Sequence, residues 1–133
     1  MFEFLSVIFI IAGLSILVII HEAGHFFIAK LFGLLVEEFG FGLPPRLWGK
    51  KIGETLYSFN WLPFGGFVKI YGERLGEEKP GFDMSRSFSH QPVHKRAVII
   101  VSGVLMNFLL GWILISVVYI IGIPQSLLVT KVK

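Results

Sequence analysis

The run His21-Glu22-Ala23-Gly24-His25 contains the residue types that bind and use a metal ion. Histidines four residues apart on a helix lie about 40° apart around its axis and one turn along it, so both imidazoles can reach one tetrahedral zinc ion (Zn²⁺). Zinc lowers the pKa of a bound water to about 7, and a glutamate beside that water can take its proton and deliver it to a leaving amine. The spacing therefore predicts His21 and His25 as metal ligands and Glu22 as a catalytic base for peptide-bond hydrolysis, once a third ligand is supplied.

Two long apolar stretches must position this motif. The first runs from Phe4 to Ile20 and resumes as Phe26-Phe27-Ile28-Ala29 after the motif, and the second runs from Ala97 to Ile123. A helix needs about 20 apolar residues to cross the hydrocarbon core, so each stretch is long enough. The chain has 133 residues, 54% of them hydrophobic and 16% charged, with a mean hydropathy of +0.76, which favours a membrane protein over a soluble domain. We expect two transmembrane helices, at about 4–32 and 97–123, in a single mainly α-helical domain embedded in the lipid bilayer.

The membrane setting favours a functional interpretation of the metal motif. An ionisable group inside a membrane segment costs roughly 3 kcal/mol on insertion scales and is functional by default. Two other interpretations stay open: the polar group only marks the cytoplasmic end of the first helix, or it binds a metal without catalysis. Phe26 to Phe32 continues the apolar stretch beyond the motif, which disfavours the first interpretation, and Glu22 disfavours the second.

The basic residues predict the orientation in the membrane. Ten of the twelve lysines and arginines lie between Lys30 and Arg96, and only Lys131 and Lys133 follow the second apolar stretch. By the positive-inside rule the connecting segment is cytoplasmic and both termini face outward. These charges are scattered among acidic and aromatic residues, so no nucleic-acid partner is expected. The chain has no cysteine, so any metal must be held by histidine, carboxylate or amide ligands.

The segment 36–73 is predicted to be a β-element that re-enters the membrane. It is rich in glycine and aromatic residues, and two extended runs, Leu56–Trp61 and Phe67–Tyr71, flank a predicted turn at Pro63-Phe64-Gly65-Gly66. Irregular backbone at membrane depth must be shielded by protein or line a water-filled cavity, so a hairpin folded against the helices is one interpretation. A loop anchored at the headgroups by its aromatic rings is the other. The stretch 74–96 is polar and is predicted to be a mobile cytoplasmic connection.

Small and polar residues recur on one face of each predicted membrane helix. Small residues let helices approach closely in a membrane, and an asparagine there seeks a hydrogen-bond partner. We expect the two stripes to face each other, which would place the asparagine near the metal as an active-site support; alternatively it only joins the helices. The stripes are Gly13, Leu17, His21 and His25 on the first helix and Gly103, Asn107 and Gly111 on the second.

Further motifs share their order and spacing with one known family. They are Phe39-Gly40-Phe41-Gly42, Gly53-Glu54-Thr55, Pro63-Phe64-Gly65-Gly66-Phe67-Val68-Lys69, Gly72-Glu73, Lys95-Arg96 and Asn107-Phe108. Together with the metal motif, they make the whole chain resemble the bacterial site-2 proteases. The resemblance is to the regulator-of-sigma-E type of intramembrane zinc metalloprotease, found in the bacterial inner membrane as a multi-pass protein.

The resemblance implies a function and roles for several residues. The family cleaves membrane-spanning substrates, with its histidine pair on zinc and its glutamate activating water, which correspond to His21, His25 and Glu22. The segment that carries Pro63, Gly65 and Gly66 resembles the family's re-entrant β-element, which presents an edge to an extended substrate. An exposed strand edge can hold such a substrate by β-augmentation. The family's second-helix asparagine corresponds to Asn107 and lies near the active site.

The sequence departs from the family in three ways. Ser102-Gly103-Val104 stands where the family usually has Ala-Gly-Pro before the asparagine. The family's third zinc ligand is an aspartate in a later membrane helix, and its outward-facing PDZ domain follows about where Val129-Thr130-Lys131-Val132-Lys133 stands. Neither the later helix nor that domain is in this sequence. We therefore expect an amino-terminal fragment, a split half or a degenerate relative, with the remaining part of the protease supplying the aspartate.

Two other functions are compatible with the same residues. A non-catalytic membrane module could capture transmembrane partners without cutting them. A metal-handling membrane protein would bind a metal at the histidines without proteolysis. An aspartate-glycine pair in a further apolar segment, of this protein or of a partner, would favour the enzyme over both.

Overall fold

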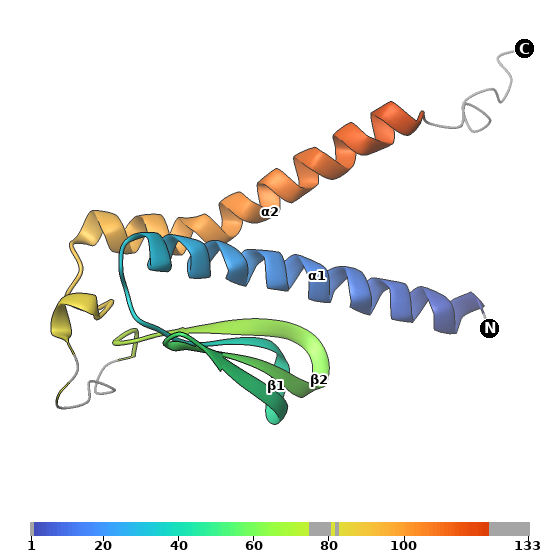
Figure 1. The fold of residues 1–133 in the computed structure, drawn as a ribbon. Helices are drawn as coiled ribbons and strands as arrows, with labels where there is room; N and C mark the ends of the chain where they lie inside the picture. Colours follow the sequence, from blue (N-terminus) through green and yellow to red (C-terminus); the bar gives the residue numbers. More distant parts are fainter. Residues whose placement is uncertain (1, 75–80, 82, 123–133) are drawn as a thin grey trace, which may run out of the picture.

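The computed structural model describes residues 2–74, 81 and 83–122 (Figure 1). Two long helices lie side by side at one end and diverge towards the other, and a sheet packs below the first helix. In chain order the elements are α1 Phe2–Leu31, β1 Val36–Ile52, β2 Thr55–Ile70, the short 3-10 helix η1 Met84–Arg86, and α2 Val93–Ile121. The predicted roles of Lys131 and Lys133, and the positions of both chain ends, concern residues outside the described ranges.

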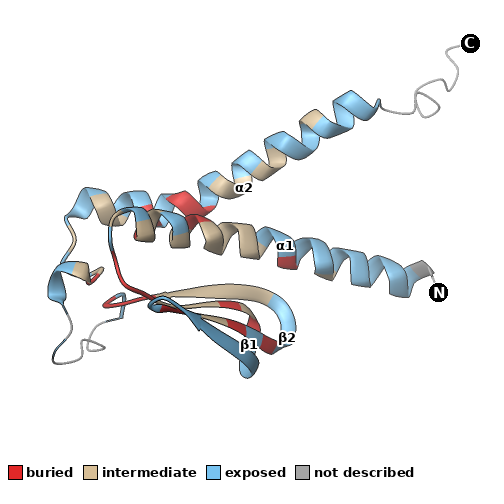
Figure 2. Ribbon diagram, viewed as in Figure 1, coloured by how far each residue is buried: buried red, intermediate tan, exposed pale blue. Residues whose placement is uncertain are grey.

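Helices α1 and α2 are each long and apolar enough to cross a membrane. Figure 2 shows that most of their surface is exposed, including the large apolar side chains of both helices. Helix α1 agrees closely with its predicted range, whereas α2 begins at Val93, four residues before the predicted Ala97. The difference arises because Pro92, with φ −54°, is compatible with a helix start, so the basic pair Lys95-Arg96 forms part of the first turn.

The β-element is present, and its predicted turn at residues 63–66 lies in a wide bend inside β2. The chain reverses at Gly53-Glu54, where Gly53 has φ +62°, and β2 then continues without a break through Pro63-Phe64-Gly65-Gly66. The glycine-aromatic run before the turn forms β1, the partner strand of this two-stranded antiparallel sheet. Residues 38–41 pair with 56–59 in the same chain direction and with 66–69 in the opposite direction, so the chain also reverses within β2, where the proline and the paired glycines predicted it.

Both strands fold back on themselves, so the sheet is wider than a simple hairpin. Phe39 pairs with Val68 on one side and with Tyr57 on the other, and the same double pairing holds for its neighbours 38–41. Residues 66–70 therefore form an outer run with 36–41 beside it. The bend in β1 lies at Gly42, which has φ +76° and whose added Cβ would meet the Leu62 carbonyl. The buried Asn60 amide donates to the carbonyls of Phe41 and Gly42, at 3.2 and 3.1 Å, and fixes this corner.

The apolar core is small and lies at the end of α1 that follows the metal motif. Its buried members come from α1, the segment after it, the start of β1, the end of β2 and the start of α2, namely Ala29, Leu34, Val36, Ile70 and Ile99. This core brings the outer run of β2 and the first turns of α2 to the same stretch of α1. It therefore determines where the two remote segments lie relative to residues 21–25.

The described part of the predicted mobile stretch is tied to the rest of the fold. Leu35 donates its N–H to the Arg86 carbonyl at 3.1 Å, and Phe88 donates to the Tyr71 carbonyl at 2.8 Å. These backbone bonds hold residues 83–91 against the ends of β1 and β2, so this part is not a free linker. Residues 75–80 and 82 of the same stretch lie outside the described ranges.

A charged cluster joins the end of α1, the strand turn and η1. Arg86 binds both Glu54 carboxylate oxygens, at 2.9 and 2.6 Å, and its Nε donates to the Gly33 carbonyl at 3.0 Å. Lys30 adds an ion pair with Glu54 at 2.9 Å. The hydrogen bonds from Arg86 and then Lys30 lower the pKa of Glu54 to about 2. The cluster therefore anchors the strand turn to the helix only while Glu54 is ionised.

Acidification is expected to weaken this anchor in a defined pH window. A carboxyl whose pKa is lower in the folded protein stabilises the fold above its unfolded pKa, here 4.5, and loses that contribution as pH falls towards 2. Glu54→Gln should therefore unfold at a lower temperature than the wild type at pH 6, and the difference should shrink as the pH is lowered to 3. Thermal unfolding in detergent measures this. Arg86→Gln should show the same dependence of unfolding temperature on pH. A double variant that is no less stable than either single variant would support direct coupling between Glu54 and Arg86. A difference between Glu54→Gln and the wild type that does not change with pH would contradict the prediction.

Candidate metal centre and active site

The two histidines of the motif lie on the face of α1 that meets α2. Their ring centroids are 4.8 Å apart, and His25 Nδ1 lies 2.7 Å from the Ile99 carbonyl oxygen. A carbonyl oxygen can only accept, so His25 Nδ1 carries the proton and donates it. This tautomer leaves the Nε2 lone pair of His25 free, as a metal ligand requires.

Both Nε2 atoms lie close to the backbone of α2 at Gly103. A Cβ added to Gly103 would lie 2.5 Å from His25 Nε2 and 2.6 Å from His21 Nε2. The two nitrogens can thus lie together against α2 only because residue 103 has no side chain. Two imidazole nitrogens held near one another suit zinc, for which histidine is a common ligand. The residues present therefore fit the metal that the motif predicts.

Asn107 lies beside the Nδ1 atom of His21. Its Nδ2 is 3.3 Å from His21 Nδ1, and its buried Oδ1 has no hydrogen-bond partner among the described residues. When His21 binds a metal through Nε2, its Nδ1 carries a proton and needs an acceptor. A half-turn of the amide brings Oδ1 to that nitrogen. Asn107 Oδ1 then accepts a hydrogen bond from His21 Nδ1, as the Ile99 carbonyl oxygen accepts one from His25 Nδ1.

This pairing predicts a graded effect of substitutions at Asn107. Asn107→Leu removes the acceptor and should weaken zinc binding by about 10- to 100-fold, the usual effect of losing such a partner. Asn107→Asp keeps an acceptor and should remain closer to the wild type. Zinc affinity measured by competition with a chelator tests both. Equal affinities for the leucine variant and the wild type would show that Asn107 only joins the helices.

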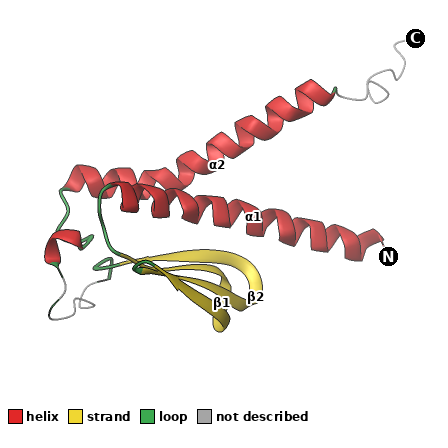
Figure 3. Cartoon of the chain, in the orientation of Figure 1, coloured by secondary structure: helices red, strands yellow, loops and turns green. Residues whose placement is uncertain are grey.

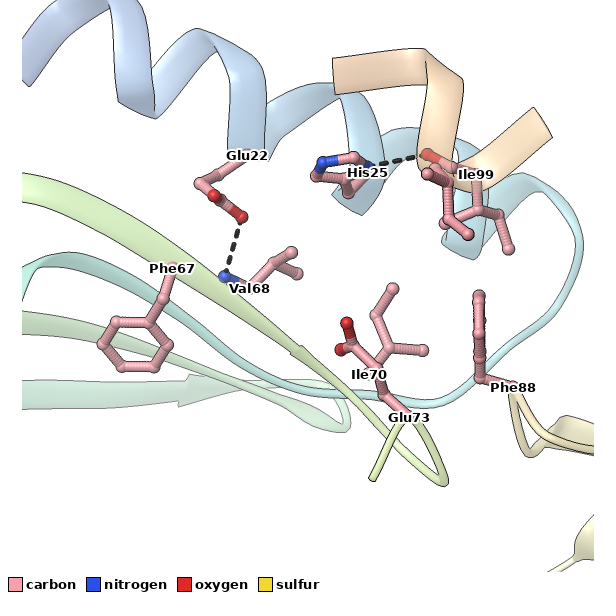
Figure 4. A pocket seen from close by; sticks show the side chains of 9 residues that line it. Glu22, His25, Phe67, Val68, Ile70, Glu73, Phe88 and Ile99 are labelled. Atoms are coloured by element: carbon pink, nitrogen blue, oxygen red, sulfur yellow. Dashed lines mark hydrogen bonds between the residues drawn. The ribbon is translucent and has the colours of Figure 1, made fainter. Parts of the chain in front are cut away.

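Glu22 faces the sheet, away from α2. The Val68 N–H donates to Glu22 Oε2 at 3.2 Å, as Figure 4 shows. Val68 lies in the outer run of β2, so this N–H points outward from the sheet edge. Glu22 and His25 both line a cavity of about 340 Å³ between α1, the edge of β2 and the start of α2. The carboxylate is thus placed between the histidines and a strand edge.

The other predicted site residues, in β2, contact α1 nearer its N-terminus than the histidines do. Ser15 donates to the Pro63 carbonyl at 3.0 Å, a Cβ at Gly65 would touch Val18 at 3.5 Å, and one at Gly66 would lie 2.9 Å from the Gly40 carbonyl oxygen. Pro63, Gly65 and Gly66 are not among the residues that line the Glu22 cavity. They hold β2 close to the helix, and their predicted contact with substrate stays a prediction.

The two small-residue stripes meet only in their middle. A Cβ at Gly24 would lie 2.5 Å from the Ser102 carbonyl oxygen, so the helices touch there. A Cβ at Gly13 or Gly111 would have no atom of the described chain within 4 Å. The two stripes therefore face each other near the histidines, as predicted. At the ends of the stripes the prediction is wrong, because α1 and α2 diverge (Figure 3).

Comparison with known proteins assigns this arrangement to a family. Residues 9–131 match the family described as Peptidase family M50. The chain belongs to peptidase family M50. A protein of Clostridium perfringens provisionally named a zinc metalloprotease is 44% identical to it over 81% of this chain and 31% of the relative. The Regulator of sigma-E protease RseP of Escherichia coli is 37% identical over 86% of this chain and 25% of its own length.

These relatives confirm the resemblance to the regulator-of-sigma-E type of site-2 protease. Protease RseP of Yersinia pestis is likewise 36% identical, over 86% of this M50 chain and 26% of that protein. The chain thus spans about a third or less of the length of the relatives named here. Membership of a metalloprotease family supports zinc as the metal. Among residues 2–74, 81 and 83–122, no three histidine, cysteine, aspartate or glutamate side chains are arranged to hold a metal ion together.

Sequence reasoning missed four parts of this candidate site. They are the Ile99 carbonyl, the Val68 N–H, the space over Gly103 and the carboxylate of Glu73, which lines the same cavity as Glu22. The first two are main-chain groups, which any residue type could supply, so the sequence carries no signal for them. Gly103 stood in a predicted stripe, but its role there was inferred as helix contact rather than as room for the two histidine rings.

Proposed function

We propose that this M50 chain forms the zinc-binding part of an endopeptidase that cuts transmembrane proteins within the membrane. The observation that carries the proposal is the position of Glu22, between the paired histidines of α1 and the outer edge of β2. His25 lies six residues before α1 ends at Leu31, about 9 Å along the helix axis, so the site is within the membrane-length helix.

Several residues of this chain have separate roles in the proposed hydrolysis. Zinc, when bound, supplies the Lewis acidity that polarises the scissile carbonyl and the attacking water. His21 and His25 would hold it through Nε2, oriented by Asn107 and the Ile99 carbonyl. Glu22 takes the proton of the attacking water and gives it to the leaving amine. The third ligand would be an aspartate from a further segment of the protease, as in the family.

The outer run of β2 is proposed to hold the substrate. A transmembrane helix must unwind before a protease can cut it, and an extended segment can pair with an exposed strand edge. The Val68 N–H is one of the groups such a segment would use. Because this N–H now binds Glu22, pairing with a substrate carbonyl would release the carboxylate beside the scissile bond. The base would become free when the substrate is in place.

The orientation and location follow the charge distribution. We propose that the segment between α1 and α2 is cytoplasmic, with both ends outside, in a bacterial inner membrane. The aromatic tip of the sheet, which includes the exposed Trp48, Trp61 and Phe64, would then enter the membrane beside α1. These groups would otherwise be large apolar side chains exposed to water.

Removal of the metal tests the proposal. The natural full-length protein, purified in detergent, should cleave a labelled transmembrane peptide, lose this activity on treatment with a zinc chelator and recover it when zinc is restored. Cleavage that survives complete removal of zinc would refute the proposal. Peptide binding without cleavage would indicate a capture module, and zinc binding without either would indicate metal handling.

A further inference from the structure

The cavity beside Glu22 contains a second carboxylate, which the mechanism above does not use. Glu73 follows β2 and lines the same 340 Å³ cavity as Glu22 and His25. Figure 4 shows its carboxylate turned into the cavity, on the side away from α1. Within the described residues, this carboxylate has no hydrogen bond or ion pair from another side chain. It is therefore available to a ligand that enters the cavity.

The turn that carries Glu73 is held firmly in place. Tyr71 is buried and donates its N–H to the Leu35 carbonyl at 2.9 Å, and its own carbonyl accepts from Phe88 at 2.8 Å. Glu73 donates its N–H to the Ile70 carbonyl at 3.2 Å. Gly72 has φ +72°, and an added Cβ would collide with the Ser87 hydroxyl. These contacts place the Glu73 carboxylate at one end of the β2 edge.

The other residues that line the cavity indicate which kind of ligand side chain fits it. Apart from the two carboxylates and His25, its lining is apolar and includes Phe67, Ile70, Phe88 and Ile99. A side chain that matches such a space has a long apolar stem and a positive head, as lysine and arginine have. Glu22 is committed to the scissile bond, which leaves Glu73 as the partner of the positive head.

We propose that Glu73 is a specificity-determining residue that binds the ammonium or guanidinium group of a lysine or arginine close to the scissile bond. The inference rests on the proposed protease function and names the class of substrate. It agrees with the proposed orientation, because a transmembrane substrate carries its excess of lysine and arginine at its cytoplasmic end. Charge pairing at the end of the strand edge would set the register of the bound segment.

A set of matched substrates tests the proposal in the natural full-length protein. The peptides share one transmembrane sequence and differ at a single position near the cut, which holds lysine, methionine or glutamate; the position is moved one residue at a time along the peptide. At one position lysine should exceed methionine in kcat/KM by about tenfold or more, mainly through KM, as expected for a charge-assisted hydrogen bond. Glutamate should be the poorest there.

Variants assign the preference to one residue. Glu73→Gln should abolish the lysine preference while zinc content and thermal unfolding stay unchanged, and Glu73→Lys should invert it in favour of glutamate. Glu3→Gln is the matched control, because Glu3 lies in the first turn of α1 and lines neither cavity to which Glu73 contributes. A lysine preference that persists in Glu73→Gln, or that disappears in Glu3→Gln, would overturn the proposal.

A binding measurement separates this proposal from the protease itself. In a Glu22→Gln background, fluorescence anisotropy of the labelled peptides reports affinity without cleavage. The lysine peptide should bind about tenfold more tightly than the methionine peptide, and Glu73→Gln should remove the difference. If the wild type never cleaves and the preference is present, the protease function fails and the role of Glu73 stands. If all peptides bind and are cleaved equally, the role of Glu73 fails and the protease function stands.

Discussion

Glu22→Gln is expected to reduce peptide-bond cleavage by about 10²- to 10⁴-fold while zinc stays bound, because the amide cannot accept the proton of the attacking water. The amide keeps the shape of the side chain, and its oxygen can still accept the hydrogen bond that Val68 donates at 3.2 Å. His21 and His25 are unchanged, so the metal content should remain that of the wild type. Cleavage of a transmembrane peptide and zinc content, measured on one preparation, test both halves of the prediction.

The control for Glu22→Gln is the same change at another carboxylate. Glu38→Gln alters a residue of β1 outside the cavity and should leave cleavage and zinc content near wild-type values. Undiminished cleavage by Glu22→Gln would refute the assignment of the base. Loss of zinc together with activity would show instead that Glu22 acts by holding the metal.

Gly103→Ala should weaken zinc binding although it replaces neither histidine. The new methyl group would lie 2.5 and 2.6 Å from the two Nε2 atoms, closer than real Cβ contacts allow. Overpacking of this kind costs typically about 1–3 kcal/mol, so zinc affinity should fall by about 10- to 100-fold, and activity with it. Chelator competition and a cleavage assay measure the two effects.

Gly111→Ala is the matched control, eight residues further along the same helix face. A Cβ there has no described atom within 4 Å, so zinc affinity should not change. If both alanine variants behaved alike, the effect would lie in helix α2 as a whole rather than in the space between the histidines. Wild-type zinc affinity in Gly103→Ala would mean that the metal is bound elsewhere.

The sequence predicted the two helices well because each is specified locally. Apolar runs such as Phe4–Ile20 and Ala97–Ile123 are long enough to identify membrane-length helices from composition alone. The sheet was predicted less accurately. Glycine and proline mark a bend in the backbone, but they do not say whether it is a tight turn between two strands, as at Gly53, or a wide bend inside one strand, as at Gly65 and Gly66. Pairing partners far apart in the chain decide that.

What the sequence alone determined is the metal motif, since the spacing of His21, Glu22 and His25 is a property of one helix. What surrounds that motif was decided only by the tertiary structure. The space over Gly103, the N–H of Val68 and the carboxylate of Glu73 come from segments distant in the chain, brought together by a small apolar core at one end of α1. Helical periodicity fixes which residues share a face of one helix. It does not fix what that face meets, because packing between remote segments depends on the whole fold.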